Sequence, residues 1–121
     1  MSLSEFDTIS HYFNSARLGF SRSGVSVGIG DDGAVIQPPQ GSSLSMSMDL
    51  LVEGVHFPRK ANSNSIANRA LAVNLSDLSA MAARPLCFTL GLSLPSLNED
   101  WLEGFSEGFS KIAKRFNCPL V

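Results

Sequence analysis

The alternation of apolar and polar residues predicts two strands. In residues 44–49, a leucine and two methionines share one face and three polar residues share the other. Residues 86–94 alternate again, with large apolar side chains on one face and small residues on the other. Met46 and Met48 are therefore expected to fill space in the core. Shorter strands are predicted at 25–29, 34–37 and 118–121.

Apolar residues recur at helical spacing in three further segments, which predicts helices over 4–14, 63–83 and from Asn98 onward. The second helix is apolar on nearly all sides and is expected to be buried. Asp77 interrupts that otherwise dry surface. These elements predict an α/β fold, in the broad sense that includes α+β, with a mixed β-sheet covered by two long helices.

Length and composition indicate one globular domain over residues 1–121. A net charge of −2 argues against binding to nucleic acid, because nucleic-acid-binding proteins normally carry a basic patch or stripe. No apolar stretch approaches the ~20 residues of a membrane span, and no signal peptide is recognisable at the start. Cys87 and Cys118 are far apart and are expected to be free, buried thiols of a cytoplasmic protein.

Carboxylates end three apolar or small-residue segments. Asp31 and Asp32 lie in a Gly-Ile-Gly-Asp-Asp-Gly turn, and Asp77 lies in the long helix. Asp49 ends the first alternating strand and shares a face with Ser47, an arrangement suited to joint ligation of one ion. Mg²⁺ favours oxygen ligands, often one or two carboxylates plus substrate phosphates. The pattern therefore predicts metal-assisted phosphate chemistry.

Each of these features also has a structural explanation. The Gly-Asp-Asp-Gly run at 30–33 is an ordinary hairpin turn. Asp77 could form an ion pair with Arg69 or Arg84, or accept a hydrogen bond from Asn74. His56, which has no partner visible in the sequence, would by itself be a loop or core histidine.

Four segments, taken together and in this order, resemble the amino-terminal domain of the thiamine-monophosphate kinase family. This family belongs to the superfamily of aminoimidazole ribonucleotide synthetase. The segment around His56 and the Asn-Leu-Ser-Asp run are the most specific of the four. The matching segments are 28–32, 47–49, 51–57 and 72–81.

The resemblance implies ATP-dependent phosphorylation of thiamine monophosphate to thiamine diphosphate, with several Mg²⁺ ions and no protein nucleophile. His56 would contact the substrate, and Asp31 and Asp32 would lie at the ATP site. Asp31 is the weaker candidate of the two. The implied metal ligands are Asp32, Ser47, Asp49 and Asp77, together with the main-chain carbonyl of Met48.

Two positions depart from the family pattern. Met48 stands where the family usually has threonine, and by alternation its side chain points away from Asp49. Any metal contact there is therefore expected from the main chain. Ala83 stands where the family tends to have glycine. If the backbone at Ala83 needs a positive φ, alanine costs on the order of 1 kcal/mol.

The resemblance also implies a homodimer in which two copies join their sheets into a barrel. In the family, a Gly-Gly-Asp segment and a second domain follow the position of Leu120. We therefore expect residues 1–121 to be an ATP- and Mg²⁺-binding dimerisation domain that lacks the family's C-terminal domain and is inactive alone. Two alternatives stay open: another ATP-dependent synthetase of the superfamily, and a non-catalytic dimerisation or cation-binding module.

Overall fold

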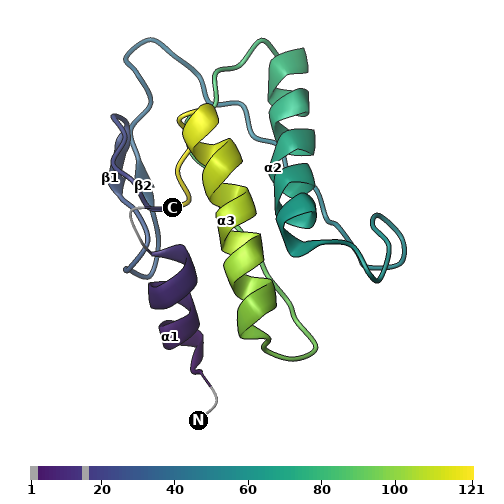
Figure 1. Cartoon of the computed structure of the whole chain (residues 1–121). Coiled ribbons are helices and arrows are strands. Elements are labelled where there is room, and N and C mark those ends of the chain that lie inside the picture. Colours follow the sequence, from purple (N-terminus) through teal and green to yellow (C-terminus); the bar gives the residue numbers. More distant parts are fainter. Residues whose placement is uncertain (1–2, 15–16) are drawn as a thin grey trace.

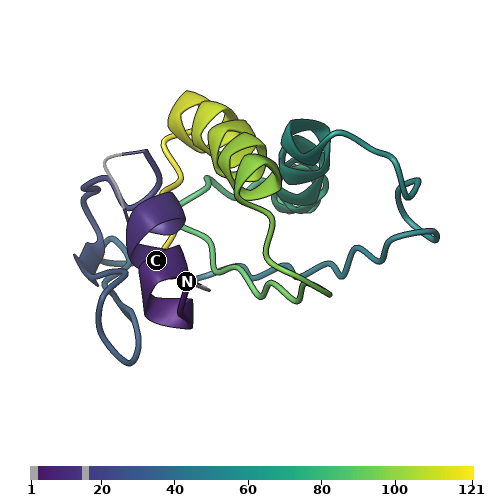
Figure 2. The same ribbon diagram turned by 60° about the horizontal axis from the view of Figure 1, so that its bottom comes forward.

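Two long helices lie side by side over a layer of extended chain in the computed structural model, which describes residues 3–14 and 17–121 (Figure 1). Helix α2 spans Ser63–Ala80 and helix α3 spans Glu99–Arg115. Figure 2 shows the extended segments running beneath both helices, with the N-terminal helix at one end of the layer. The predicted combination of helices over extended strands is confirmed as an α+β architecture.

The two long helices begin where local side-chain chemistry predicts. The Asn62 side chain accepts hydrogen bonds from the backbone of Asn64 and Ser65 and so satisfies free amides of the first turn of α2. Asn98 does the same for Trp101 in α3. Helix α3 also has acidic residues in its first turn and basic residues in its last, which complements the helix dipole.

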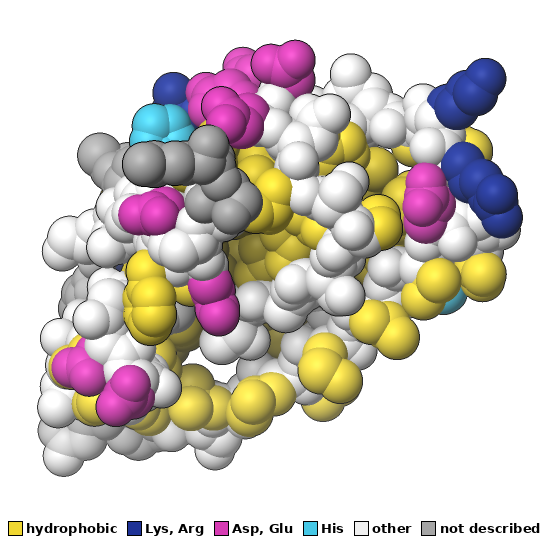
Figure 3. All heavy atoms as spheres, turned by 90° about the horizontal axis from the view of Figure 1, so that it is seen from below, with side chains coloured by type: hydrophobic (Ala, Val, Ile, Leu, Met, Phe, Trp, Pro, Cys, Tyr) yellow, Lys and Arg dark blue, Asp and Glu magenta, His cyan; other side chains and the backbone are white. Residues whose placement is uncertain are grey.

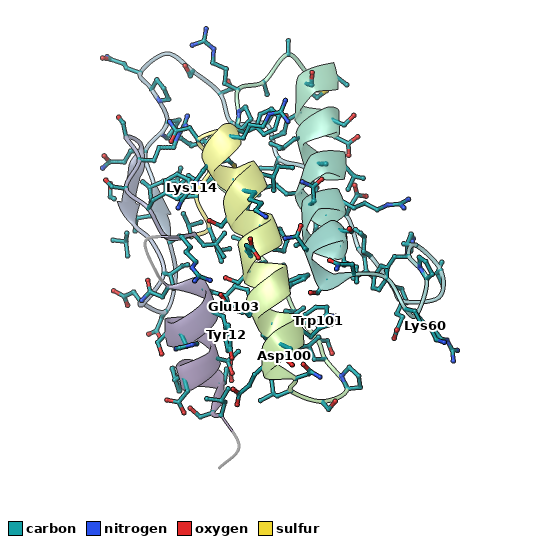
Figure 4. The ribbon with its side chains drawn as sticks, viewed as in Figure 1. Tyr12, Lys60, Asp100, Trp101, Glu103 and Lys114 are labelled. Carbon is teal, nitrogen blue, oxygen red and sulfur yellow. The ribbon has the colours of Figure 1, made fainter. Side chains whose placement is uncertain are left out.

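The N-terminal helix departs from a regular α-helix after one turn. Helix α1 spans Glu5–Thr8, and its N-terminus is closed by a reciprocal capping box between Ser4 and Asp7. The chain then continues as a π-helix, η1, over Ile9–Phe13. Figure 4 shows Tyr12 of η1 between this N-terminal helix and α3. The buried Ser106 hydroxyl on α3 donates a hydrogen bond to the Tyr12 carbonyl and ties the two together.

The regular sheet is small. Strand β1 (Val25–Val27) pairs antiparallel with β2 (Val35–Ile36), as the two short predicted strands require. The predicted strand at 118–121 contributes a single parallel bridge between Phe88 and Leu120. Its hydrogen bonds run from Phe88 N to the Pro119 carbonyl and from Val121 N to the Phe88 carbonyl, both at 3.0 Å.

The long strands expected at 44–49 and 86–94 do not form ladders. Residues 44–49 have no backbone partner within the described part of the chain, and in 86–94 only Phe88 is bridged. Alternation depends on the two faces of a segment, whereas a ladder also needs a neighbouring edge. The apolar face of 86–94 is nevertheless placed as predicted, because Phe88, Leu90 and Leu94 pack against the core.

The core lies between the two long helices and the chain beneath them. Phe109 of α3 stacks on Phe88 with ring centroids 5.4 Å apart and meets Phe105 edge-on at 4.9 Å. Helix α2 buries one stripe rather than nearly all of its surface, which corrects the expectation of a fully buried helix. The buried residues of α2 are Ile66, Ala67, Leu71 and Leu75.

The two helices approach each other at two glycines of α3. A Cβ added at Gly108 would collide with the Asn64 carbonyl oxygen, and would lie 2.8 Å from Asn64 Cα and 3.0 Å from Ala67 Cβ. A Cβ at Gly104 would meet the Ser63 hydroxyl at 2.5 Å. The backbone at Asn64 cannot yield as a flexible side chain does, so Gly108 sets the distance between the helices.

The residue in the left-handed conformation at the end of α2 is Ala82, with φ 54°, and not Ala83. The Ala83 amide donates to the Leu78 carbonyl at 2.9 Å and the Ala82 amide to Ser79 at 3.0 Å, which defines a Schellman motif. A left-handed alanine costs about 1 to 2 kcal/mol relative to a right-handed one. The penalty expected at Ala83 therefore falls one residue earlier.

No helix within the described part of the chain combines the length and the apolar character that a membrane span requires.

We predict that Gly108→Ala lowers the free energy of unfolding by on the order of 2 kcal/mol, because the new methyl group forces the helices apart. In an ordinary helix interior the same change is stabilising by about 1 kcal/mol, so the sign itself is diagnostic. Gly91→Ala is the control, since a Cβ there meets nothing within 4 Å. Chemical denaturation would measure both, and a Gly108→Ala variant as stable as the parent would contradict the close approach.

Candidate metal and substrate site

A hydrogen-bonded cluster joins the extended segment 44–52 to α2. The Ser47 hydroxyl lies 3.1 Å from Asp77 Oδ2 and 3.1 Å from Asn74 Oδ1, and it can donate its single proton to either oxygen. Asn74 Nδ2 donates in turn to the Ala70 carbonyl at 2.9 Å, which directs the amide oxygen toward Ser47. Two of the candidate metal ligands, Ser47 and Asp77, are therefore in direct contact.

Asp77 is exposed, not enclosed in a dry helix surface as the sequence suggested. Only the side of α2 that faces α3 is buried, and Asp77 lies off that side. The alternative ion pair with Arg69 or Arg84 is not formed, since the salt bridges among the described residues involve neither arginine. Within the described chain, the side-chain partner of Asp77 is Ser47.

The extended segment points its polar face toward the protein and its apolar face outward, the reverse of a usual amphipathic strand. Its polar face contacts α2 through Ser47, while Met46 and Met48 are each 91% exposed. Both methionines were expected in the core, and that prediction is wrong because the helix layer covers the polar face instead. In Figure 3, hydrophobic side chains follow the edge of the molecule opposite the helices.

His56 is held in a compact loop directly after this segment. Its Nδ1 accepts a hydrogen bond from the Val52 amide at 2.9 Å, so the proton of the neutral imidazole is carried by Nε2. The loop is closed by the Gly54 amide donating to the Phe57 carbonyl at 2.8 Å. Gly54 has φ 78°, a conformation that glycine adopts without strain.

Asp49 and His56 line one pocket of about 150 Å³, together with Arg69 and Val73 of α2. The structure thus brings a candidate metal ligand and the candidate substrate contact to the same place. Arg69 was considered from the sequence only as an ion-pair partner of Asp77. Its spacing was the available signal, because positions 69, 73 and 77 follow one face of a helix.

Asp31 and Asp32 lie in the turn between β1 and β2, and both are exposed. The Asp32 amide donates to the Asp31 carboxylate at 2.9 Å, and Gly30 has φ 114°. The hydrogen bonds and ion pairs of the described residues do not join these carboxylates to Ser47, Asp49 or Asp77. The described residues also hold no group of three or more His, Cys, Asp and Glu side chains placed to bind a metal ion.

The donor chemistry of the cluster fits a hard cation. A serine hydroxyl and an aspartate carboxylate meet at hydrogen-bond distance, with no sulfur or imidazole among them. Mg²⁺ takes such oxygen ligands and completes its shell with water and phosphate oxygens. Ser47 and Asp77 are therefore of the ligand types that a Mg²⁺ site uses.

The two cysteines are free, as expected from the sequence. Burial raises the pKa of Cys118 to about 11 and also raises the pKa of Cys87. Both thiols are therefore protonated at neutral pH, a form that neither binds metals nor attacks electrophiles well. They take no part in the candidate site.

Residues 30–121 match the family described as AIR synthase related protein, N-terminal domain. The chain belongs to this family. It is 42% identical over 121 residues to a protein of Escherichia coli (strain K12) named thiamine-monophosphate kinase, and 45% identical over 94 residues to one of Synechococcus elongatus with the same name. The first alignment covers 100% of this chain and 37% of the relative, and the second covers 76% and 29%.

A solved member of the family has the same fold. The crystal structure of thiamine-monophosphate kinase from Stenotrophomonas maltophilia K279a superimposes with a TM-score of 0.82 at 45% identity. The match covers 100% of this chain and 37% of that one. The AIR synthase-like fold expected from the sequence is confirmed, and the chain spans about 37% of the length of the relatives that it matches over its whole length.

In the present chain, we expect Asp49→Ala to raise the Kd for Mg²⁺ at least tenfold, because it removes a carboxylate beside the Ser47–Asp77 cluster. Met48→Thr should leave the affinity unchanged, since the Met48 side chain is 91% exposed on the opposite face of the segment. Calorimetric titration with Mg²⁺, with and without ATP, would measure both. The reverse ranking of the two variants would contradict the assignment of Asp49 as a metal ligand.

Proposed function

We propose that this chain is the amino-terminal part of an ATP-dependent kinase that phosphorylates thiamine monophosphate to thiamine diphosphate. The observation that carries the proposal is the 3.1 Å contact between Ser47 and Asp77, which joins two family motifs far apart in the sequence. The thiamine-monophosphate kinases of Escherichia coli and Stenotrophomonas maltophilia match this chain over its whole length at 42% and 45% identity.

The metal ligands of the proposal are Ser47, Asp49 and Asp77, the Met48 carbonyl, and Asp32 from the β1–β2 turn. Bound Mg²⁺ would neutralise the charge of the phosphates that meet during transfer. Within the described chain, Asp32 makes no contact with the Ser47–Asp77 cluster. We propose that bound ATP connects Asp32 to this cluster. Asp31, the neighbouring carboxylate of this turn, would also contact the ATP phosphates through bound Mg²⁺.

The proposed role of His56 is substrate contact. Its Nδ1 is occupied by the Val52 amide, so Nε2–H is the hydrogen-bond donor left for a ligand. No protein nucleophile is required, since the phosphate of thiamine monophosphate itself attacks the γ-phosphoryl group. The protein contributes positioning and charge neutralisation, which account for most of the catalysis in phosphoryl transfer.

A turnover assay with ATP, Mg²⁺ and thiamine monophosphate tests the proposal. We expect the full-length protein that contains this chain to form thiamine diphosphate, and the 121-residue chain alone to form none. Asp77→Asn in the full-length protein should lower kcat at least a hundredfold, because the amide retains the shape but loses the metal-binding charge. Arg84→Gln is the matched control, being an exposed charge just beyond α2.

Product formation from another phosphorylated or carboxylated acceptor, with none from thiamine monophosphate, would instead favour a different synthetase of the superfamily. Mg²⁺ binding without any turnover by the full-length protein would favour a non-catalytic module.

The proposal includes a homodimer in the cytoplasm. Its support is the apolar face that the helices leave uncovered: the exposed fraction is 91% for Met46 and Met48 and 77% for Leu50. Adjacent large apolar side chains at such exposure are typical of an interface. Residues 44–49 also make no backbone hydrogen bond within the described part of the chain, so a second copy can pair with them as a neighbouring strand. The two free cysteines fit a reducing compartment.

Light scattering on the chain should give the mass of a dimer. Met46→Lys combined with Met48→Lys should give a monomer, because two charges would be buried without partners in the interface. Phe6→Lys is the control, since Phe6 is 82% exposed and lies on α1. A monomer at all concentrations for the parent chain, or a dimer that survives both lysines, would contradict dimerisation through this face.

A further inference from the structure

We infer that Arg69 binds the phosphate group of the substrate, and that it selects phosphorylated thiamine over thiamine. This inference rests on the proposed function and deepens it. It follows from the position of Arg69 on α2, the composition of the pocket, and the charges that surround the guanidinium.

Arg69 shares one face of α2 with the metal-ligand candidate Asp77. The two are eight residues apart with Val73 between them, and two turns of helix separate them by about 12 Å. The extended segment runs antiparallel to this face: Ser47 is opposite Asp77, and Asp49 comes to the pocket beside Arg69. Helix α2 thus places a cation at one end of the site and a metal ligand at the other.

The pocket beside Arg69 has the size for a substituent rather than for a whole ligand. Its volume of about 150 Å³ is well below the roughly 300 Å³ at which pockets for complete small molecules begin. It accommodates a phosphate group, while the rest of the ligand extends out of it. The lining residues that carry charge or hydrogen-bonding groups are Asp49, His56 and Arg69.

The Arg69 side chain is exposed, and within the described chain no carboxylate forms an ion pair with it. The pocket holds one carboxylate, Asp49, which the proposed function assigns to Mg²⁺. A guanidinium presents two parallel N–H donors to two oxygens of a phosphate, an arrangement that an ammonium or imidazole does not reproduce. Arg69 therefore has both the charge and the shape to hold the acceptor phosphate next to the metal.

The loop before α2 carries two other cations, Arg59 and Lys60. Lys60 illustrates the difference from Arg69. Figure 4 shows it in the loop that precedes the helix, directed away from the helices. Neither Arg59 nor Lys60 lines the pocket, whereas Arg69 does. Of these three cations, Arg69 is therefore the one placed to hold a phosphate in the pocket.

The experiment is calorimetric binding of thiamine monophosphate and of thiamine to the full-length protein in the presence of Mg²⁺. We expect Arg69→Gln to raise the Kd for thiamine monophosphate at least tenfold and to leave the Kd for thiamine unchanged. Arg69→Lys should give an intermediate Kd for thiamine monophosphate, since it keeps the charge and loses the two parallel N–H donors. Arg84→Gln serves as the control and should change neither Kd.

The thiamine titration also reports on folding, because a misfolded variant would lose both ligands. If Arg69→Gln binds thiamine monophosphate as tightly as the parent, or weakens both ligands equally, the role assigned to Arg69 is wrong and the proposed function stands. If the parent protein does not prefer thiamine monophosphate to thiamine, the proposed function fails as well.

Discussion

The close approach of α2 and α3 at Gly108 is the constraint on which the rest of the structure depends. With the Asn64 backbone against Gly108, the helices are near enough for Ala67 and Leu71 to be buried between them. The same approach brings Phe109 onto Phe88 in the layer beneath. Because this contact fixes the rotation of α2 about its axis, it also fixes which of its residues face the extended segment.

That rotation explains the inverted polarity of residues 44–52. Once Asn74 and Asp77 face the segment, Ser47 is the side chain that contacts them, and the alternating methionines must point outward. The polar cluster and the exposed apolar face are therefore two consequences of one arrangement. An arrangement of this kind is unfavourable for an isolated chain but not for a subunit whose outer face is covered.

Features set by neighbouring residues could be predicted from the sequence. The starts of the two long helices, at 63 and at Asn98, and the short strands around the Asp31–Asp32 turn follow from the sequence. Features that depend on distant contacts could not. Alternation showed that 44–49 has two faces, but not that the polar one would face inward, so the methionines were misplaced.

The same distinction between local and distant contacts applies to the candidate site. Ser47 and Asp77 lie in contact across 30 residues of sequence, so local pattern alone could not place them together and only the family resemblance grouped them. The proposed role of Arg69 could not be predicted from the sequence, because it depends on Asp49 and His56 lying beside it in space. The spacing of 69, 73 and 77 becomes informative only once the helix face that carries it is known.

The exposure of Asp77 and Asp49 has a consequence for how such a site becomes active. Carboxylates in water cost nothing to keep charged, but their attraction to a cation is weak there, because the effective dielectric constant is high. Covering the outer face of 44–52 and filling the pocket would exclude water, and would strengthen every interaction among these groups. In the proposed dimer, assembly and ligand binding would be coupled through the same nine residues, because one face carries the candidate metal ligands and the other face is exposed.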